Sequence, residues 1–221
     1  MGLDMYLQKA KRVKDVSVEQ LVHLNNYFDY LERPEDCQKF SMEEWCGDEL
    51  GNVNVDLIED YIAEYIQRYS SWDEEKRYGY KTIFQQIAVW RKANHIHKWF
   101  VDNVQDGIDN CESYEVTEKH LQELLNICVR VKKASKLVKG KIQNGYTYAN
   151  GKMITNFTYG EYIDDPSVAK ELLPTDEGFF FGSTNYDQWY MEDVDYTINI
   201  LNKILKETDF QKEIVIYSSS W

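Results

Sequence analysis

The sequence has few of the features that divide a chain or anchor it in a membrane. Only 3 prolines occur among 221 residues, and no Gly/Ser-rich run interrupts the chain, so a flexible linker between domains is not expected. The longest apolar run is much shorter than a membrane span. The charged, alternating segment 1–14 is not typical of a signal peptide. We therefore expect a single domain over residues 1–221, in the cytoplasm and without membrane association.

The usual patterns of metal sites and of covalent catalysis are also missing. The 4 cysteines form no C-x-x-C pair, which is unlike a zinc site. His95 and His97 are two residues apart on a predicted helix, where their side chains point about 200° apart and cannot hold one ion. No Ser or Cys stands in a nucleophile-elbow motif. We expect no metal and no cofactor.

Positive charge is in short supply. The chain has 25 Lys and Arg against 38 Asp and Glu, a net charge of -13. Non-specific DNA binding is therefore not expected, because neutralisation of phosphates dominates the affinity of such binding. An acidic surface can simply keep a protein soluble. It can also mimic the charge of nucleic acid toward a basic partner, which would make a host protein the target.

Apolar residues are plentiful enough for a core, at 43% hydrophobic and 14% aromatic. Leu3, Met5 and Leu7 alternate with polar residues, which predicts a strand. Two Asn-Gly dipeptides, at 144–145 and 150–151, predict tight hairpin turns, and residues 141–163 are predicted to form a small antiparallel flap or meander. The run of three phenylalanines at 179–181 predicts a strand over 178–182 that is covered on both faces.

Helical periodicity accounts for most of the remaining chain. Ser17 with Gln20 three residues later forms a capping box, and Thr117 is placed to cap another helix. Helices are predicted at 17–33, 41–46, 54–69, 82–104, 118–131, 167–173 and 187–207. The prediction is an α+β fold dominated by helices. Its small sheet would combine the N-terminal strand, the 178–182 strand and a C-terminal strand at 213–217.

The segment Ile87–Val104 is the first candidate for function, because it carries many groups that can donate hydrogen bonds or stack. At helical spacing Ile87, Trp90, Asn94, His97, Val101 and Val104 form one stripe. His97 has two interpretations: a histidine at the edge of the core bonded to a carbonyl, or a general base with a pKa near neutrality. The candidate ligand-binding residues of this segment are Trp90, Arg91, Lys92, Asn94, His97 and Trp99.

The segment Gly178–Asp187 is the second candidate. A glycine-bearing turn before a helix leaves backbone N–H groups unpaired, and Gly182, Ser183 and Thr184 could cradle a phosphate or carboxylate there. It is not a Walker loop, because the spacing and the lysine are absent. In the structural alternative, Ser183, Thr184 or Asp187 only caps the helix. The nearby aromatic residues Tyr186, Trp189, Tyr190 and Trp221 could stack a base or anchor an oligomer interface.

Carboxylates gather at the start of the last helix: Asp187, Glu192, Asp193 and Asp195. Compensation of the helix dipole explains them adequately. Acid–base chemistry or Mg²⁺ binding would need two of them aimed into one cleft. In that case His97 and Asp193 would be the catalytic candidates.

Several blocks of the sequence resemble a family of small proteins encoded by phages and prophages. They are MGLDMYL at 1–7, WRKAN at 90–94, HKWF at 97–100, GFFFGST at 178–184 and YSSSW at 217–221. The resemblance spans nearly the whole chain. It implies a viral accessory protein in a bacterial cytoplasm, and proteins of that kind often blunt host defence. The resemblance brings no catalytic residue with it.

Three hypotheses follow. In the first, the chain binds a small phosphate-bearing, nucleotide-derived molecule, such as a host-defence signal, in a pocket between the two candidate segments. Such a pocket could lie at the seam of a homodimer. In the second, it inhibits a host enzyme through its acidic, aromatic surface. In the third, it is a hydrolase or phosphodiesterase, metal-independent or Mg²⁺-dependent, that uses His97 and a carboxylate. Whether the protein is an enzyme stays open, and the first hypothesis requires that both segments line one cavity.

Overall fold

The computed structural model describes residues 2–32, 67–69, 80–149, 151–178 and 181–221. The helix predicted at 41–46 and most of the helix predicted at 54–69 lie outside these residues. The last three residues of the predicted helix 54–69 form strand β2 (Gln67–Tyr69) instead. This strand pairs with β3 (Tyr80–Thr82).

The fold is α+β, as the sequence predicts, and its centre is a four-stranded antiparallel sheet in the order β4-β1-β8-β5. The strands are β1 (Asp4–Lys11), β4 (Gln85–Arg91), β5 (Tyr114–Val116) and β8 (Glu213–Ser220). The N-terminal and C-terminal strands therefore pair with each other at the middle of the sheet, and β4 and β5 take its edges.

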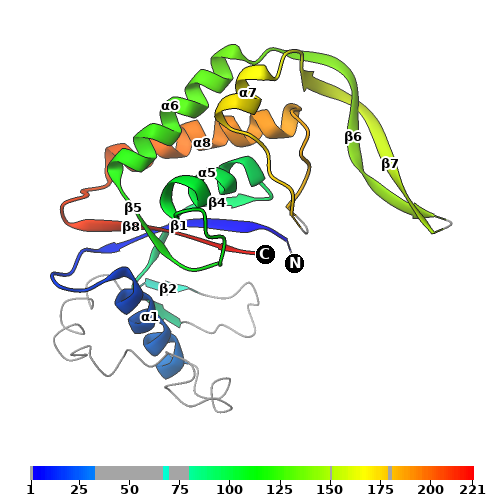
Figure 1. Cartoon of the computed structure of the whole chain (residues 1–221). Coiled ribbons are helices and arrows are strands. Elements are labelled where there is room, and N and C mark those ends of the chain that lie inside the picture. Colours follow the sequence, from blue (N-terminus) through cyan, green and yellow to red (C-terminus); the bar gives the residue numbers. More distant parts are fainter. Residues whose placement is uncertain (1, 33–66, 70–79, 150, 179–180) are drawn as a thin grey trace.

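Apolar side chains cover both faces of β8. Val215 and Tyr217 belong to the larger core cluster, whereas Ile214 and Ile216 belong to the smaller one. A strand that is buried on both faces reads as a continuous apolar run rather than an alternating one. Figure 1 shows the corresponding layers, with α5, α6 and α8 on one side of the sheet and α1 on the other.

The helices are α1 (Val18–Glu32), α5 (Asn94–Val104), α6 (Glu118–Ala134), α7 (Ser167–Leu172) and α8 (Gln188–Glu207). The predicted caps are confirmed. Ser17 and Gln20 exchange hydrogen bonds at the start of α1. The Thr117 hydroxyl accepts from the His120 amide, and Asp187 caps α8. None of the described helices has the length and apolar character needed to span a membrane.

The helix predicted over 82–104 is wrong in its first half. Residues 85–91 form β4, in which Ala88 and Trp90 are buried while Val89 is exposed. The chain then turns at Lys92, whose φ of 61° is left-handed, and α5 begins at Asn94. The stripe from Ile87 to Val104 fitted a period of 3.6, but pairing with β1 favours the period of two.

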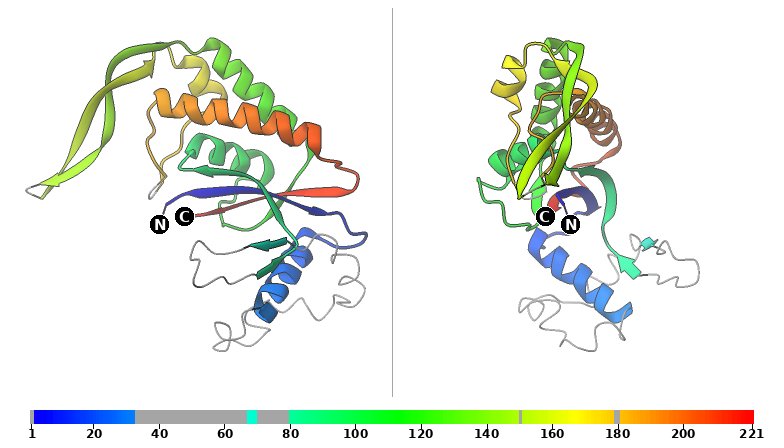
Figure 2. Two further views of the ribbon diagram at one scale, coloured as in Figure 1. Left: turned by 180° about the vertical axis from the view of Figure 1, so that it is seen from behind. Right: turned by 90° about the vertical axis from the view of Figure 1, so that its right-hand side faces the viewer.

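The predicted hairpin flap is confirmed as a long two-stranded arm made of β6 (Leu137–Ala149) and β7 (Lys152–Ile163). Gly151, with a φ of 73°, lies at its tip. Gly145 lies instead at a β-bulge, where the register shifts between Gln143 and Tyr146. The two Asn-Gly dipeptides thus belong to one hairpin with one tip. The left view of Figure 2 shows the arm projecting from the body.

The strand predicted over 178–182 is not part of the central sheet. Gly178, Phe181 and Gly182 belong to no strand, and residues 179–180 lie outside the described part of the chain. Phe181 is nevertheless buried, because its ring packs edge-on against His97 and Trp221. A loop therefore satisfies the apolar character that suggested a strand.

Candidate functional site

A cleft of about 1050 Å³ opens where four parts of the chain meet. They are the turn between β4 and α5, the loop 177–185, the start of α8, and the two strands of the hairpin arm. A volume of this size suits a small organic ligand. Of the candidate residues from the sequence, those that line the cleft are Arg91, Lys92, Gly182, Ser183, Thr184, Trp189 and Asp193.

Asn94 fixes the loop that forms one wall. Its amide nitrogen donates to the carbonyl oxygens of Phe181 (3.2 Å) and Ser183 (2.9 Å), and its Oδ1 accepts from the Asp176 amide (3.1 Å). The side chain is 1% exposed and does not line the cleft. Asn94 therefore positions the wall, and the sequence analysis had assigned it to the ligand itself.

Lys92 and Gly182 face each other across the same wall. A Cβ on Gly182 would meet both Cβ and the carbonyl oxygen of Lys92 at 2.9 Å, and Gly182 has a φ of 100°. The Lys92 amide donates to the Leu3 carbonyl (2.8 Å), which ties this turn to the sheet. Only glycine allows the loop to pass this close to the turn.

This side of the cleft can hold an anion. The backbone amides of Gly182, Ser183 and Thr184 make no hydrogen bond within the described part of the chain. The Lys92 side chain is exposed and has no ion pair with a described residue. Arg91 is 69% exposed, and its Nε lies 3.8 Å from the Asp4 carboxylate. Two cations and three amide donors therefore lie along one wall.

Carboxylates also line the cleft, namely Glu177, Asp187, Glu192 and Asp193. Asp187 is 2% exposed, and its Oδ1 accepts from the amides of Trp189 (3.0 Å) and Tyr190 (3.3 Å). Its Oδ2 is buried and has no partner among the described residues. Burial raises the pKa of Asp187. Burial, together with the charges of Glu192 and Asp187, raises the pKa of Asp193 to about 7. Asp193 therefore exchanges a proton near neutral pH.

His95 is a member of the site that the sequence analysis missed. It lies in the first turn of α5, lines the cleft and stacks on the Tyr190 ring at 4.1 Å between centroids. Burial lowers its pKa to about 3, so the imidazole is neutral at physiological pH. Its Nε2 is buried without a partner in the described structure. The predicted stripe ran through Asn94 and His97, and His95 points about 200° away from His97, so the stripe did not include it.

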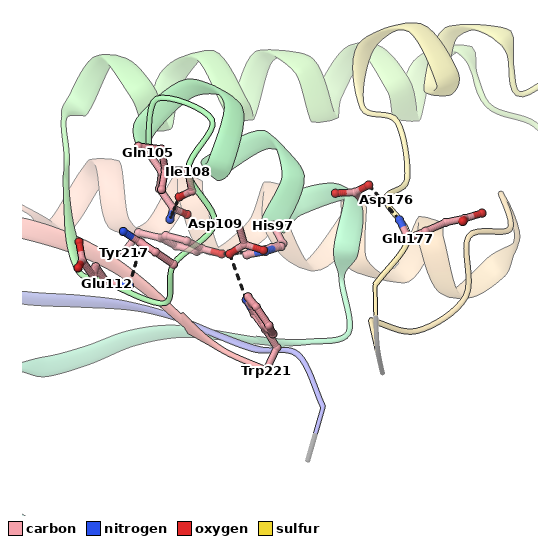
Figure 3. Close-up of polar contacts among 10 residues, drawn as sticks. His97, Gln105, Ile108, Asp109, Glu112, Asp176, Glu177, Tyr217 and Trp221 are labelled. Atoms are coloured by element: carbon pink, nitrogen blue, oxygen red, sulfur yellow. Dashed lines mark hydrogen bonds and ion pairs between the residues drawn. The ribbon is translucent and has the colours of Figure 1, made fainter.

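His97 lies elsewhere. Its side chain is fully buried, with Nδ1 2.7 Å from the Tyr217 hydroxyl and Nε2 3.0 Å from Asp109. The indole of Trp221 donates to the other oxygen of Asp109 (3.1 Å). Figure 3 shows His97 next to Asp109 and the Tyr217 hydroxyl. His97 does not line the cleft, so the structure does not bring it together with Asp193.

The aromatic candidates do not all line the cleft either. Trp90 is buried and donates from Nε1 to the Thr197 hydroxyl (2.9 Å), and Trp99 is buried against Phe100. Tyr186 packs on Tyr190 and does not line the cleft. Trp189 remains, 37% exposed at the cleft wall. The arm contributes Tyr146 and Met153, which the sequence analysis had not assigned to the site.

Among the described residues, no three His, Cys, Asp or Glu side chains are arranged to hold a metal ion. Comparisons of the chain with protein-family models, with curated proteins and with solved structures give no match. The candidate site is therefore defined by the geometry of its own residues.

Proposed function

We propose that the chain binds a small, phosphate-bearing, nucleotide-derived molecule in this cleft. The observation that supports the proposal is that Lys92, Gly182–Thr184 and the exposed Trp189 line one cavity of about 1050 Å³. The amides of Gly182–Thr184 have no hydrogen-bond partner among the described residues. These groups come from segments about ninety residues apart in the sequence. Their convergence supplies an anion-binding wall and a stacking surface within the reach of one ligand.

The charged groups of α8 and of the turn before α5 suggest how the ligand is oriented. A phosphate would be repelled by Asp187, Glu192 and Asp193, so it belongs beside Lys92 and the loop amides. Carboxylates accept hydrogen bonds from the exocyclic amino groups of bases. The base therefore belongs beside the three carboxylates, stacked on Trp189, an interaction worth about 1–3 kcal/mol. A nucleotide carrying a base with an amino group satisfies both sets of groups.

The resemblance to phage-encoded proteins gives this binding a role: sequestration of a nucleotide signal of the host's defence in the bacterial cytoplasm. Binding without turnover is sufficient for that role. Hydrolysis of the ligand is a second candidate, favoured by one observation, the pKa of about 7 of Asp193 at the cleft wall. A carboxylate with this pKa is suited to general acid–base catalysis near neutral pH. In this version Asp193 acts without His97.

A thermal-shift assay of the full chain against a panel of nucleotides and cyclic nucleotides tests the proposal. A ligand at one hundred times its Kd stabilises by about 2.7 kcal/mol, which corresponds to a rise in Tm of about 5–10 °C for a chain of this size. Chromatography of the same mixtures measures turnover. An unchanged ligand supports binding alone, and product that disappears in Asp193→Asn supports hydrolysis.

Variants locate the site. Lys92→Ala and Trp189→Ala should each weaken binding by about tenfold or more, since each removes a contact worth more than about 1 kcal/mol. Lys203→Ala is the matched control, because Lys203 is exposed on α8 and does not line the cleft. If no nucleotide raises the Tm, the proposal is wrong. Inhibition of a host enzyme through the protein surface then becomes the leading hypothesis.

A further inference from the structure

The hairpin arm exposes an unusual set of side chains. Across its strands Tyr148 is opposite Met153, and Lys141 is opposite Tyr159, so the members of each pair share a face. Ile154 is next to Met153 in β7 and points to the other face. The large apolar and aromatic side chains exposed on the arm are Tyr146, Tyr148, Met153, Ile154, Phe157, Tyr159 and Tyr162, which are 39–76% exposed.

The body holds the arm at its base and, further out, at Gln143, whose Oε1 accepts from the Asn185 side-chain amide (3.1 Å). The Glu161 amide donates to the side-chain oxygen of Gln188, and the Ile163 amide donates to the Tyr186 carbonyl. In the outer part of the arm, beyond Gln143, the side-chain hydrogen bonds of the described residues stay within the hairpin, as between Thr147 and Asn156. A two-stranded ribbon on its own is at best marginally stable in water. The outer arm therefore lacks the packing that would hold it in place.

The charge of the arm is opposite to that of the rest of the chain. The arm, residues 137–163, contains three lysines and one glutamate, a net charge of +2, whereas the whole chain has a net charge of -13. The remaining residues therefore carry -15. The arm is thus attracted to a surface like that of its own body.

We propose that the arm docks on the acidic body of a second copy of this chain, so that two copies exchange arms in a symmetric dimer. The exposed apolar area of the arm is large enough for a stable protein–protein interface. At roughly 200 Å² per large side chain, the exposed fractions add up to on the order of 800 Å² per arm, one partner's share of a standard interface. Tyr, Phe and Met are also the residue types enriched at interface cores.

A single-stranded nucleic acid is the competing occupant, since it also stacks on aromatic side chains and pairs with lysines. The body disfavours it, because a charge of -15 on the rest of the chain repels a polyanion. The apolar side chains of Met153, Ile154 and Phe157 are distributed over both faces of the ribbon. A ribbon covered on both faces fits insertion between protein surfaces better than one-sided base stacking.

The dimer would also affect the cleft. Tyr146 and Met153 belong both to the arm and to the lining of the cleft. A second copy seated on the arm would therefore stand beside the mouth of the cleft and shield it from solvent. This consequence rests on the proposed function, whereas the dimer itself requires no ligand.

Sedimentation velocity of the full chain without added nucleotide tests the inference. We expect a species of twice 26.3 kDa that dissociates as NaCl is raised, because the attraction between arm and body is screened by salt. The double variant Tyr148→Ser/Tyr159→Ser, at two positions that are each 76% exposed, should weaken dimerisation by about a hundredfold or more. Lys139→Glu/Lys152→Glu should do the same and should reduce the salt dependence.

Ile108→Ser is the matched control, because Ile108 is 57% exposed but lies outside the arm. The Ile108→Ser variant should dimerise as strongly as the wild type. All variants replace exposed side chains, so circular dichroism should give wild-type spectra. A wild-type chain that stays monomeric at the highest concentration overturns the inference, as does a dimer that survives both arm variants. Arm-dependent binding of a fluorescent single-stranded oligonucleotide by a monomer would also overturn it and assign the arm to nucleic acid.

Discussion

Asn94 offers the sharpest test of how the cleft is built, because one buried side chain holds three parts of its wall. Asn94→Ala removes the donor to the carbonyls of Phe181 and Ser183 and the acceptor for the Asp176 amide. Ser183 is exposed and Asp176 half-buried, so water can replace those two bonds at a net cost of about 1 kcal/mol each. Phe181 is buried, so leaving its carbonyl without a hydrogen bond costs about 2 kcal/mol of stability.

The sum is about 4 kcal/mol, which should lower the Tm by about 8 °C or more for a chain of this size. Differential scanning calorimetry measures the loss. Asn94→Asp has nearly the same volume and keeps the acceptor for Asp176, but it turns a carboxylate oxygen toward two carbonyls. It should therefore destabilise at least as much as alanine, which separates hydrogen bonding from packing. Asn202→Ala, which removes one exposed bond to the Ile198 carbonyl, should change stability by less than about 0.5 kcal/mol.

Binding provides the second readout. Once its anchor is lost, the loop no longer holds the amides of Gly182–Thr184 beside Lys92, so Asn94→Ala should weaken nucleotide binding as strongly as Lys92→Ala does. Isothermal titration at a temperature well below the Tm of the variant measures the loss without unfolding. A variant that melts within about 2 °C of the wild type, a change of less than about 1 kcal/mol, would refute the reasoning. The loop would then be held by other contacts.

Three further predictions concern the same cleft. Asp193→Asn should stabilise the protein above pH 7 by on the order of 2–4 kcal/mol. The raised pKa of Asp193 makes the wild type lose stability as the pH rises from about 4 to 7, and the asparagine variant has no such loss. Urea titrations at several pH values measure the difference. In the wild type, His95 stays neutral below pH 6.5 while the same histidine of the unfolded chain gains a proton, so stability falls by about 1.4 kcal/mol per pH unit. His95→Phe keeps an aromatic ring packed on Tyr190 and should remove this part of the pH dependence. Gly182→Ala should lower the Tm by several degrees and weaken binding by about tenfold, because its methyl group meets Lys92 at 2.9 Å; an unchanged Tm would contradict the close approach.

The sequence predicted best those elements whose signals are local. Ser17 and Gln20 cap α1 within one helical turn, and Asp187 caps α8 by accepting from the amides of Trp189 and Tyr190. The hairpin followed from an Asn-Gly dipeptide at its tip. Such signals are local because the hydrogen bonds that they satisfy lie within a few residues. The helix boundaries around them were accordingly predicted to within a few residues.

The segment 85–104 failed because two periodicities overlap in it. Ile87, Trp90 and Asn94 fit a helix, while Ala88 and Trp90 fit a strand equally well. The decision comes from pairing with β1, some eighty residues earlier in the chain, which no local pattern contains. The error also shifted the start of the helix, so that His97 was expected in the cleft where the structure places His95.

The hairpin arm shows a different limit of the sequence analysis, because the net charge of the whole chain does not give the charge of one segment. A net charge of -13 argued against any basic surface, yet segment 136–160 contains no acidic residue at all. Electrostatic attraction acts over about a Debye length, roughly 8 Å at physiological salt. A surface separated from the body by the length of a strand therefore keeps its own sign of charge. Local charge becomes informative once the hairpin is known to project, and that depends on how its base packs against α8.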